Sequence, residues 1–252
     1  MTGSVRSPAG YAAAAAGRRH LTGTSSDETS FTPGPVLLLG APGVGKGTQA
    51  KALMAEFAIP QISTGDLLRE HRRNHTELGL LADELMQRGQ LVPDELVNKM
   101  VAARLADPDC CRGYILDGFP RTLTQANWLD GYLVERDAAC PVVAIHIRVD
   151  HDELLRRITG RRISPVGRIY NIYTAPPRVP GKCDVDGSTL VQRNDDSEEV
   201  FEQRMKTFYE QTAPVIEHYR DCGRFAEVDG ALAVEAVTAA IGAELQRLRK
   251  GA

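Results

Sequence analysis

A short apolar run followed by closely spaced glycines and a lysine constrains the fold of this chain more than any other feature. Residues 36–39 read VLLL and end at a glycine, which is typical of a strand buried on both faces. Residues 40–48 read GAPGVGKGT and contain the spacing G-x-x-x-x-G-K. Glycines at this spacing let the backbone turn its N–H groups toward a phosphate, at the start of the helix expected over 45–57. The sequence therefore predicts a strand, a phosphate-binding loop and a helix.

The residues of this loop define one candidate nucleotide site. Lys46 supplies a mobile positive charge for the outer phosphates. Gly47 stands where serine or threonine usually follows the lysine, and Thr48 comes one residue later, so we expect a Mg²⁺ ion to be held largely through water. A glycine-rich turn can also be a plain connection from strand to helix, but here the strand, the spacing and the helix agree. The residues expected to bind a nucleoside triphosphate are Gly43, Val44, Gly45, Lys46, Gly47 and Thr48.

Apolar runs alternate with amphipathic stretches along the rest of the chain. The runs cover 113–116, 142–147 and 225–228, the stretches cover 94–106 and 200–219, and a last helix covers 231–249. Strands that alternate with helices predict an α/β fold, a parallel sheet with helices on both faces. Residues 163–192 carry Gly, Pro, Asp and aromatic residues without a helical period, which is typical of a functional lid or a small subdomain.

The first residues differ in composition from the rest. Residues 1–34 are rich in Ala, Gly, Ser and Thr, contain Arg6, Arg18 and Arg19, and have no acidic residue before Asp27. This composition predicts either a disordered tail or a mitochondrial targeting segment, so the expected location is cytoplasmic or mitochondrial. Ordered structure is expected over 35–252.

Composition argues against several classes of function. The net charge of −3 argues against broad binding to nucleic acid, and no apolar run approaches the ~20 residues of a membrane-spanning helix. The 5 cysteines include no C-x-x-C pair, which argues against a zinc ribbon or a thioredoxin-like redox site. We expect reduced thiols in an intracellular compartment.

One further stretch, QISTGDLLRE (61–70), carries residues suited to a second nucleotide. Thr64 and Gly65 stand at an expected helix start, and Arg69 stands near the end of its first turn. A plain helix N-cap followed by a solvated arginine is the alternative interpretation.

A second such stretch, ILDGFPR (115–121), begins in an apolar strand. Asp117 ends this strand and faces the phosphate-binding loop, where it can hold Mg²⁺ through water; a helix cap is the alternative. Arg121 and Gln125 are four residues apart, so we expect them on one helix face, in contact with a phosphate and a base.

Seven strings in the sequence resemble those of adenylate kinases of the long-lid type. They are GAPGVGKGTQ, QISTGDLLR, GQLVPDELV, LDGFPRT, GRR, QRNDD and QTAPVIEHY, in the order seen in that family, and the match runs from about residue 35 to residue 230. The resemblance implies a P-loop three-layer α/β fold with an AMP-binding helical insertion over 63–92 and a lid over 163–192. It also implies a Mg²⁺-dependent, reversible transfer of the terminal phosphoryl group of ATP to AMP, which gives two ADP.

The same resemblance assigns residues to the two nucleotides. The residues implied to bind AMP are Thr64, Gly65, Arg69, Val92, Gly118, Arg121, Gln125, Arg193 and Arg204. Arg157 is implied to contact the base of ATP and Arg161 its phosphates, with Asp195 and Asp196 orienting either the arginines or the hinge of the lid. The residues implied to stabilise the transferring phosphoryl group are Lys46, Arg121, Arg161, Arg193 and Arg204. Arginines on a helix can also be solvated charges, worth about 0–1 kcal/mol per ion pair.

The lid composition predicts that no structural zinc is bound. Some relatives hold this lid with four zinc ligands, whereas the corresponding region here offers only Cys183, with Ser164 and Asp186 nearby. These are too few for a tetrahedral structural site.

Two alternative functions also use a nucleoside triphosphate. A GTP:AMP phosphotransferase of the mitochondrial type would share the AMP site, and Tyr170, Asn171 and residues 190–193 (LVQR) are similar to such enzymes. A GTPase switch would need N-K-x-D, but Asn98-Lys99 is followed by Met and Val. We expect a monomer that binds ATP, or GTP, together with AMP.

Overall fold

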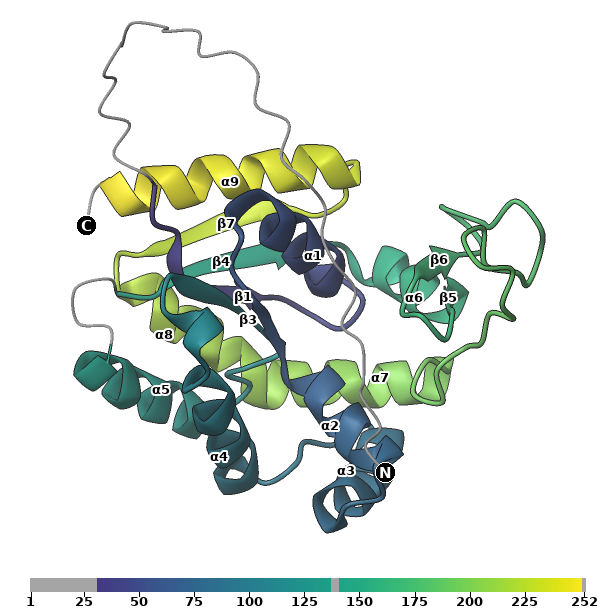
Figure 1. Ribbon diagram of the computed structural model, residues 1–252, viewed down its shortest axis with the longest axis horizontal. Coiled ribbons are helices and arrows are strands. Elements are labelled where there is room, and N and C mark those ends of the chain that lie inside the picture. Colours follow the sequence, from purple (N-terminus) through teal and green to yellow (C-terminus); the bar gives the residue numbers. More distant parts are fainter. Residues whose placement is uncertain (1–30, 137–140, 251–252) are drawn as a thin grey trace, which may run out of the picture. The chain divides into compact units, whose positions relative to one another are not determined.

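Five parallel strands form the central sheet of this computed structural model, which describes residues 31–136 and 141–250 (Figure 1). In order across the sheet they are β2 (Gln61–Ser63), β3 (Gly113–Asp117), β1 (Gly34–Leu39), β4 (Val143–Arg148) and β7 (Phe225–Asp229). The predicted α/β fold is confirmed. The expectations for residues 1–30 and for Cys140 lie outside the described residues.

The carboxyl ends of three strands meet where the phosphate-binding loop begins. Leu38 of β1 pairs with Asp117 of β3, and Ser63 at the end of β2 pairs with the same aspartate. In open parallel sheets ligands bind outside these carboxyl ends. The register therefore places the loop after β1, the residues after β2 and Asp117 at one edge of the sheet.

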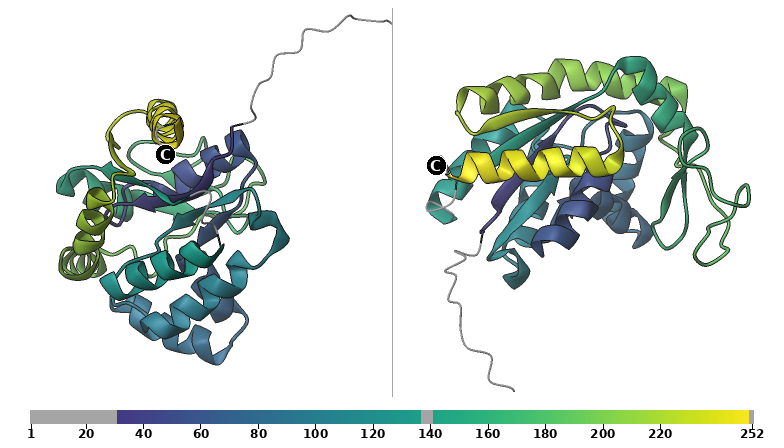
Figure 2. Two further views of the ribbon diagram at one scale, coloured as in Figure 1. Left: turned by 90° about the vertical axis from the view of Figure 1, so that its left-hand side faces the viewer. Right: turned by 90° about the horizontal axis from the view of Figure 1, so that it is seen from above.

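Helices cover both faces of the sheet (Figure 2). On one face α1 (Lys46–Phe57) packs against α9 (Val234–Lys250), and Gln49 of α1 donates to Val234 O at 3.1 Å and accepts from Thr238 Oγ1 at 2.7 Å. On the other face α4 (Asp94–Leu105), α5 (Leu123–Arg136) and α8 (Ala213–Asp221) pack over Leu37 and Leu39. Because side chains alternate along a strand, β1 contributes to the core on both faces.

Two helices separate β2 from α4. They are α2 (Thr64–Arg73) and α3 (Glu77–Gln87). Each begins with a side-chain cap: Ser63 Oγ accepts from the N–H of Asp66 at 3.3 Å, and Thr76 Oγ1 accepts from the N–H of Gly79 at 3.1 Å. The helix start expected at Thr64 is therefore confirmed. After α4, a short 3₁₀ turn (Pro108–Cys110) leads into β3.

A two-stranded antiparallel sheet lies in the segment expected to form a lid. β5 (Arg161–Ile163) follows α6 (His151–Gly160) directly and pairs with β6 (Ile169–Asn171). An isolated bridge between Ile163 and Val191 joins the two ends of the segment. The segment is therefore a small β unit inserted between α6 and α7 (Glu198–Thr207).

The amphipathic stretch expected over 200–219 is a helix with a π-helical interruption. α7 continues into π-helical residues Phe208–Thr212 and then into α8. Pro214 lies in the first turn of α8 and has no N–H to donate to the preceding turn, so the regular hydrogen-bond pattern breaks there. Thr212 Oγ1 donates instead to Arg121 O at 2.9 Å and links this interruption to the residues after β3.

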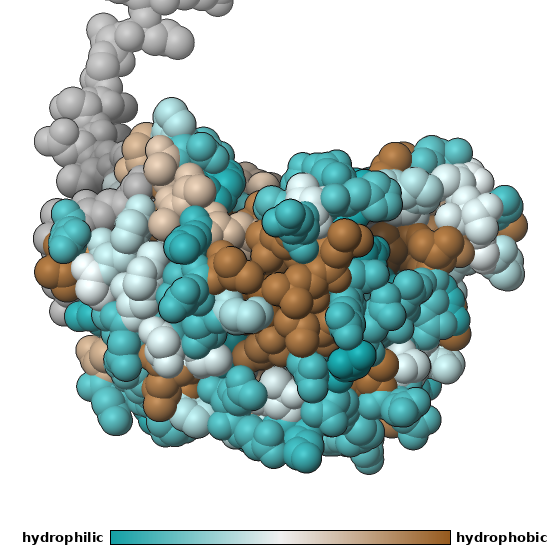
Figure 3. Space-filling view, turned by 90° about the horizontal axis from the view of Figure 1, so that it is seen from below, coloured by the Kyte–Doolittle hydropathy of each residue, from teal (hydrophilic) through white to brown (hydrophobic). Residues whose placement is uncertain are grey.

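The surface is mostly hydrophilic on the side where α3 and α4 lie, with a hydrophobic region near its centre (Figure 3). Exposed apolar side chains on α3 include Leu80 and Leu81. Within residues 31–136 and 141–250, no helix has both the length and the apolar character needed to cross a membrane.

Candidate active site

The loop after β1 contains three glycines with positive φ, and two of them also lie close to neighbouring atoms. Gly40 has φ +144°, and a Cβ atom there would lie 2.6 Å from Ile147 O. Gly43 has φ +86°, and a Cβ atom there would lie 2.8 Å from Ile158 Cγ1. Any other residue would strain the backbone and press against β4 or α6. These glycines therefore let the loop lie close to β4 and α6, directly before the N-terminus of α1.

Lys46, the first residue of α1, reaches back over this loop. Its Nζ donates to Gly40 O at 2.7 Å and to Ala41 O at 3.0 Å. Burial lowers the pKa of Lys46 from 10.5 to about 8; Asp117 opposes this shift, and neighbouring arginines add to it. The ammonium group is therefore poorly compensated, and a bound anion would stabilise its charge.

Asp117 lies beside the first turn of α1. Its Oδ2 accepts from Gln61 Nε2 at 2.9 Å, and a Cβ atom on Gly47 would lie 3.5 Å from the same oxygen. Among residues 31–136 and 141–250, no three His, Cys, Asp or Glu side chains gather as metal ligands. A single carboxylate beside a phosphate-binding loop nevertheless suits Mg²⁺, which keeps several waters and combines one or two carboxylates with substrate phosphates.

A second pocket opens beside the residues that follow β3. Thr64 Oγ1 donates to Gly118 O at 2.8 Å and joins the start of α2 to the end of β3. The pocket is lined by Thr64, Gly65, Leu68, Met86, Gln90, Leu91, Val92, Val97, Gly118, Arg121 and Gln125. Six of the residues expected to bind AMP are in this lining, and they come from three separate parts of the chain, 64–65, 92 and 118–125.

Sequence reasoning missed the apolar wall of the second pocket. Leu68, Met86 and Val97 belong to α2, α3 and α4. An apolar wall with a few polar groups is typical of a site for a small organic ligand. Each residue is an apolar position on a helix, so periodicity could assign it to a buried face but could not show what that face contacts.

Arg69 is not in the lining of the second pocket but lies beside Gly65, which is. Its Nη2 would lie 3.0 Å from a Cβ atom on Gly65, and it donates to Asp66 Oδ1 at 2.6 Å. Burial raises the pKa of Asp66, but Arg69 more than offsets this, so the net shift is downward. Arg69 is thus oriented by the carboxylate three residues before it.

Arg121 precedes α5 rather than lying on it. Arg121 and Gln125 were expected to share a helix face, but α5 begins at Leu123. The two residues meet because the backbone N–H of Arg121 donates to Gln125 Oε1 at 2.8 Å, while Arg121 Nε donates to Gly118 O at 2.8 Å. Both still line the second pocket.

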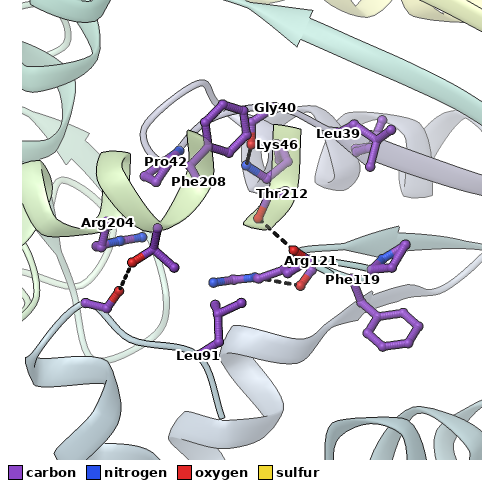
Figure 4. Close-up of a pocket in the computed structure, with 15 residues that line it drawn as sticks. Leu39, Gly40, Pro42, Lys46, Leu91, Phe119, Arg121, Arg204, Phe208 and Thr212 are labelled. Atoms are coloured by element: carbon purple, nitrogen blue, oxygen red, sulfur yellow. Dashed lines mark hydrogen bonds between the residues drawn. The ribbon is translucent and has the colours of Figure 1, made fainter. Parts of the chain in front are cut away.

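A loop pocket connects the phosphate-binding loop with the second pocket (Figure 4). Its lining includes Gly40, Pro42, Lys46, Leu91, Gly118, Arg121, Arg204, Phe208 and Thr212. Leu91, Gly118 and Arg121 line both pockets. In Figure 4, Lys46 and Arg121 lie on two sides of the loop pocket. The two candidate nucleotide sites therefore adjoin at a group of positive charges.

Two carboxylates hold two of the expected arginines in place. Arg161, at the start of β5, makes a two-pronged ion pair with the fully buried Asp196. Arg204 in α7 donates through Nη1 to Asp195 Oδ2 at 3.0 Å and to Asp195 O at 3.1 Å. Burial lowers the pKa of Arg161, but the hydrogen bonds to Asp196 outweigh it and the net shift is upward. These contacts match the orienting role expected of the two aspartates.

Arg121 and Arg193 are less well compensated. Burial lowers the pKa of Arg121 to about 10, and Arg204 adds to this shift. Burial likewise lowers the pKa of Arg193 to about 10, with Arg161 and Arg69 adding to it. Buried cations that depress one another's pKa values favour the binding of a multiply charged anion. The structure therefore brings Lys46, Arg69, Arg121, Arg161, Arg193 and Arg204 into one electrostatic group.

Arg157 lies outside both pockets, on α6. Its Nε donates to Glu153 Oε1 at 3.0 Å, and its Nη1 donates to Val44 O at 3.4 Å. It therefore contacts the phosphate-binding loop through a backbone carbonyl. Its contact with the base of ATP stays a prediction.

The segment expected to form a lid contacts α1. Lys51 Nζ donates to Gly167 O at 3.1 Å. Within the segment, Tyr170 Oη lies 3.5 Å from Cys183 Sγ, and this contact lowers the pKa of the thiol. Ser164 Oγ accepts from the N–H of Arg168 at 3.0 Å. Cys183 and Ser164, which were considered as zinc ligands, thus make hydrogen-bond contacts within this segment.

Comparisons with known proteins agree with this geometry. The sequence model of the family described as "Adenylate kinase" matches residues 38–224. A protein named adenylate kinase from Moorella thermoacetica is 47% identical over 213 residues, which cover 84% of this chain and 98% of the relative. Adenylate kinases from Thermosipho africanus and Methanothrix thermoacetophila are each 48% identical, over 80% and 78% of this chain and 94% and 91% of their own lengths. This chain belongs to the adenylate kinase family.

Proposed function

We propose that this protein catalyses the reversible transfer of the terminal phosphoryl group of ATP to AMP, which gives two ADP. The observation that carries the proposal is that the two pockets meet at Arg121, with Lys46 and Arg204 in the lining of the loop pocket. One pocket lies against a phosphate-binding loop, and the other has an apolar wall. This arrangement fits two nucleotides with their phosphates facing each other.

AMP occupies the second pocket in this proposal. The apolar wall packs against the adenine, and Thr64, Gly65, Val92, Gly118 and Gln125 surround it. Arg69 and Arg121 bind the AMP phosphate, because guanidinium groups bind phosphate oxygens through paired hydrogen bonds. Arg193 and Arg204 reach the same phosphate from the other side.

ATP occupies the loop side. The backbone of Gly43, Val44, Gly45, Lys46, Gly47 and Thr48 surrounds its phosphates at the N-terminus of α1. Arg161 binds the outer phosphates from β5, and Arg157 lies beside the base. The hydrogen bond from Arg157 Nη1 to Val44 O, at 3.4 Å, supports this place for Arg157 because Val44 belongs to the loop.

Catalysis in this site relies on positioning and charge stabilisation. Phosphoryl transfer places charge on the oxygens of the moving group and needs little covalent chemistry from the protein. The nucleophile is an ionised oxygen of the AMP phosphate, so no general base is required. Lys46, Arg121, Arg161, Arg193 and Arg204 stabilise the charge on the moving group.

Mg²⁺ fits this site as a substrate-bound ion. Asp117 would hold it through water beside the loop, and the ion would neutralise charge on the ATP phosphates when bound. A structural zinc in the lid is not part of the proposal, because the segment offers only Cys183, with Ser164 and Asp186 nearby, which are too few for a tetrahedral site.

Two segments close over the nucleotides in the proposed mechanism. Residues 63–92 cover AMP and residues 163–192 cover ATP, and closure excludes water that would otherwise accept the phosphoryl group. The hydrogen bond from Lys51 to Gly167 O supports this, because it links the lid segment to α1.

In this proposal the protein is a cytoplasmic monomer, and its phosphoryl donor is ATP. Both pockets are built from residues of a single chain, so no partner is needed to complete the site. The relatives named above come from prokaryotes and are named adenylate kinases, which favours ATP over GTP and a cytoplasmic over a mitochondrial location.

The test compares two arginine variants in an ATP-plus-AMP assay. Arg121→Ala removes a cation that lines both pockets, and Arg112→Ala removes an exposed arginine just before β3, at the opposite end of the strand. We expect Arg121→Ala to lower kcat by about 10²–10³-fold, as for loss of a charge-stabilising donor, and Arg112→Ala to match the wild type. Equal activity in the two variants would contradict the proposed role of the cation group.

A further inference from the structure

The side-chain amide of Gln125 is hydrogen-bonded at both ends. Its Oε1 accepts from the backbone N–H of Arg121 at 2.8 Å, and its Nε2 donates to Asp94 Oδ1 at 2.7 Å. Gln125 is only 2% exposed and lines the second pocket. An amide has two donor hydrogens and two acceptor lone pairs. One hydrogen and one lone pair of Gln125 therefore remain for a molecule in the pocket.

Asp94 is itself held in place. It is the first residue of α4, where the helix dipole favours a carboxylate. Its Oδ2 accepts from Thr122 Oγ1 at 2.8 Å, and the same hydroxyl accepts from the backbone N–H of Gln125 at 3.1 Å. Asp94, Thr122 and Gln125 thus form a closed ring of hydrogen bonds between α4 and the start of α5.

These contacts permit one orientation of the Gln125 amide. A backbone N–H can only donate, and a carboxylate accepts. Rotating the amide by 180° would place its oxygen against Asp94 and its NH₂ group against the N–H of Arg121. Two hydrogen bonds would be lost and two repulsive contacts would form. The free donor and the free acceptor therefore have fixed places in the pocket.

A fixed amide can distinguish adenine from guanine. Adenine presents the N6 donor next to a ring-nitrogen acceptor, and a glutamine amide pairs with both. Guanine carries the O6 acceptor where adenine has N6, so it would need the amide reversed. We propose that Asp94 is a positioning residue that gives the acceptor site its preference for adenine. The inference rests on the proposed function, because it assumes that the second pocket binds the acceptor nucleotide.

The Asp94→Asn variant tests this inference. An asparagine amide can either accept or donate, so it tolerates both orientations of Gln125. The matched control is Glu95→Gln, which removes one negative charge from the same first turn of α4 at an exposed position. The kcat and KM values are measured on the full chain for AMP and for GMP with ATP as donor, and thermal unfolding is recorded for each variant.

We expect Asp94→Asn to lower the ratio of kcat/KM for AMP to that for GMP by about tenfold or more, mainly through KM. The kcat with saturating AMP should change little, because the cation group is intact. Glu95→Gln should keep the wild-type ratio. A purely structural role for Asp94 predicts instead a lower melting temperature and the same ratio of AMP to GMP.

A second variant covers the case in which Asp94→Asn does not fold. Asp94→Glu keeps an acceptor but displaces it by one methylene, so the AMP preference should persist while KM for AMP rises. An unchanged ratio in folded Asp94→Asn, or an unchanged KM in Asp94→Glu, overturns the inference. Failure of the wild type to transfer phosphoryl from ATP to AMP overturns the proposed function instead, so the two failures are distinct.

Discussion

The lowered pKa of Lys46 predicts that ATP binding takes up a proton. The pKa is about 8 in the free protein, against 10.5 for an ordinary lysine. If the phosphates of ATP restore the ordinary value, Lys46 at pH 9 changes from about 10% to about 97% protonated on binding. Binding should therefore take up about 0.9 proton at pH 9 and about 0.2 proton at pH 7.5.

This coupling of ATP binding to protonation of Lys46 also determines how the affinity for ATP depends on pH. Because the bound state holds the proton more tightly, affinity is lost as pH rises through the free-state pKa of Lys46. From pH 7.5 to pH 9 the dissociation constant of ATP should increase about eightfold, or about 1.2 kcal/mol. Arg121 and Arg193, with pKa values of about 10, stay largely protonated over this range.

Calorimetric titration of ATP in two buffers of different ionisation enthalpy measures the proton uptake directly. Lys46→Arg should abolish it, because arginine stays charged throughout this range. Lys99→Arg changes an exposed lysine of α4 that lines neither pocket and should leave the uptake as in the wild type. Uptake below about 0.2 proton at pH 9, or equal uptake in Lys46→Arg, would refute the reasoning.

Three further changes test the surrounding structure. Asp196→Ala leaves Arg161 without its buried partner and should destabilise the fold by about 3–5 kcal/mol in urea unfolding; a loss below 1 kcal/mol would contradict the importance of this ion pair. Gly43→Ala should abolish ATP binding in calorimetry, because residue 43 has φ +86° and its new Cβ would lie 2.8 Å from a side chain of α6. Gly131→Ala is the control in α5, where the new Cβ meets open space, and it should stabilise the protein by about 0.5–1 kcal/mol. Asp117→Asn should raise the Mg²⁺ concentration for half-maximal turnover by about tenfold, and an unchanged requirement would exclude Asp117 from holding the ion.

The phosphate-binding loop and the parallel sheet could be predicted from sequence because both depend on local patterns. Gly40, Gly45 and Lys46 stand at the spacing G-x-x-x-x-G-K between an apolar run and an amphipathic stretch, and these three local features together predict a strand, a turn and a helix. The three residues of β2 were missed, because Gln61–Ser63 is too short to show alternation. The π-helical residues after α7 were missed, because the spacing of apolar residues does not show that a backbone hydrogen bond is lost at Pro214.

The site beyond the loop depends on contacts that sequence spacing does not encode. Gln125 and Asp94 are 31 residues apart, and only the packing of α4 beside α5 brings the amide to the carboxylate. Arg121 and Gln125 were paired for the wrong reason, since their contact runs through a backbone N–H rather than along a helix face. The aspartates beside Arg161 and Arg204 were expected from the family resemblance. The lowered pKa of Arg121 could not be predicted, because burial and the nearby Arg204 cause it and only the structure shows both.

The most direct test of the central claim is phosphoryl transfer followed by ³¹P NMR with the purified full chain and Mg²⁺. ATP and GTP are each offered with AMP, and each is also offered alone. The proposal predicts rapid formation of two ADP from ATP and AMP, slower transfer from GTP, and little hydrolysis of ATP without AMP. ATP hydrolysis that does not depend on AMP, or no transfer to AMP from either donor, would contradict the claim that the two pockets hold the two substrates of one reaction.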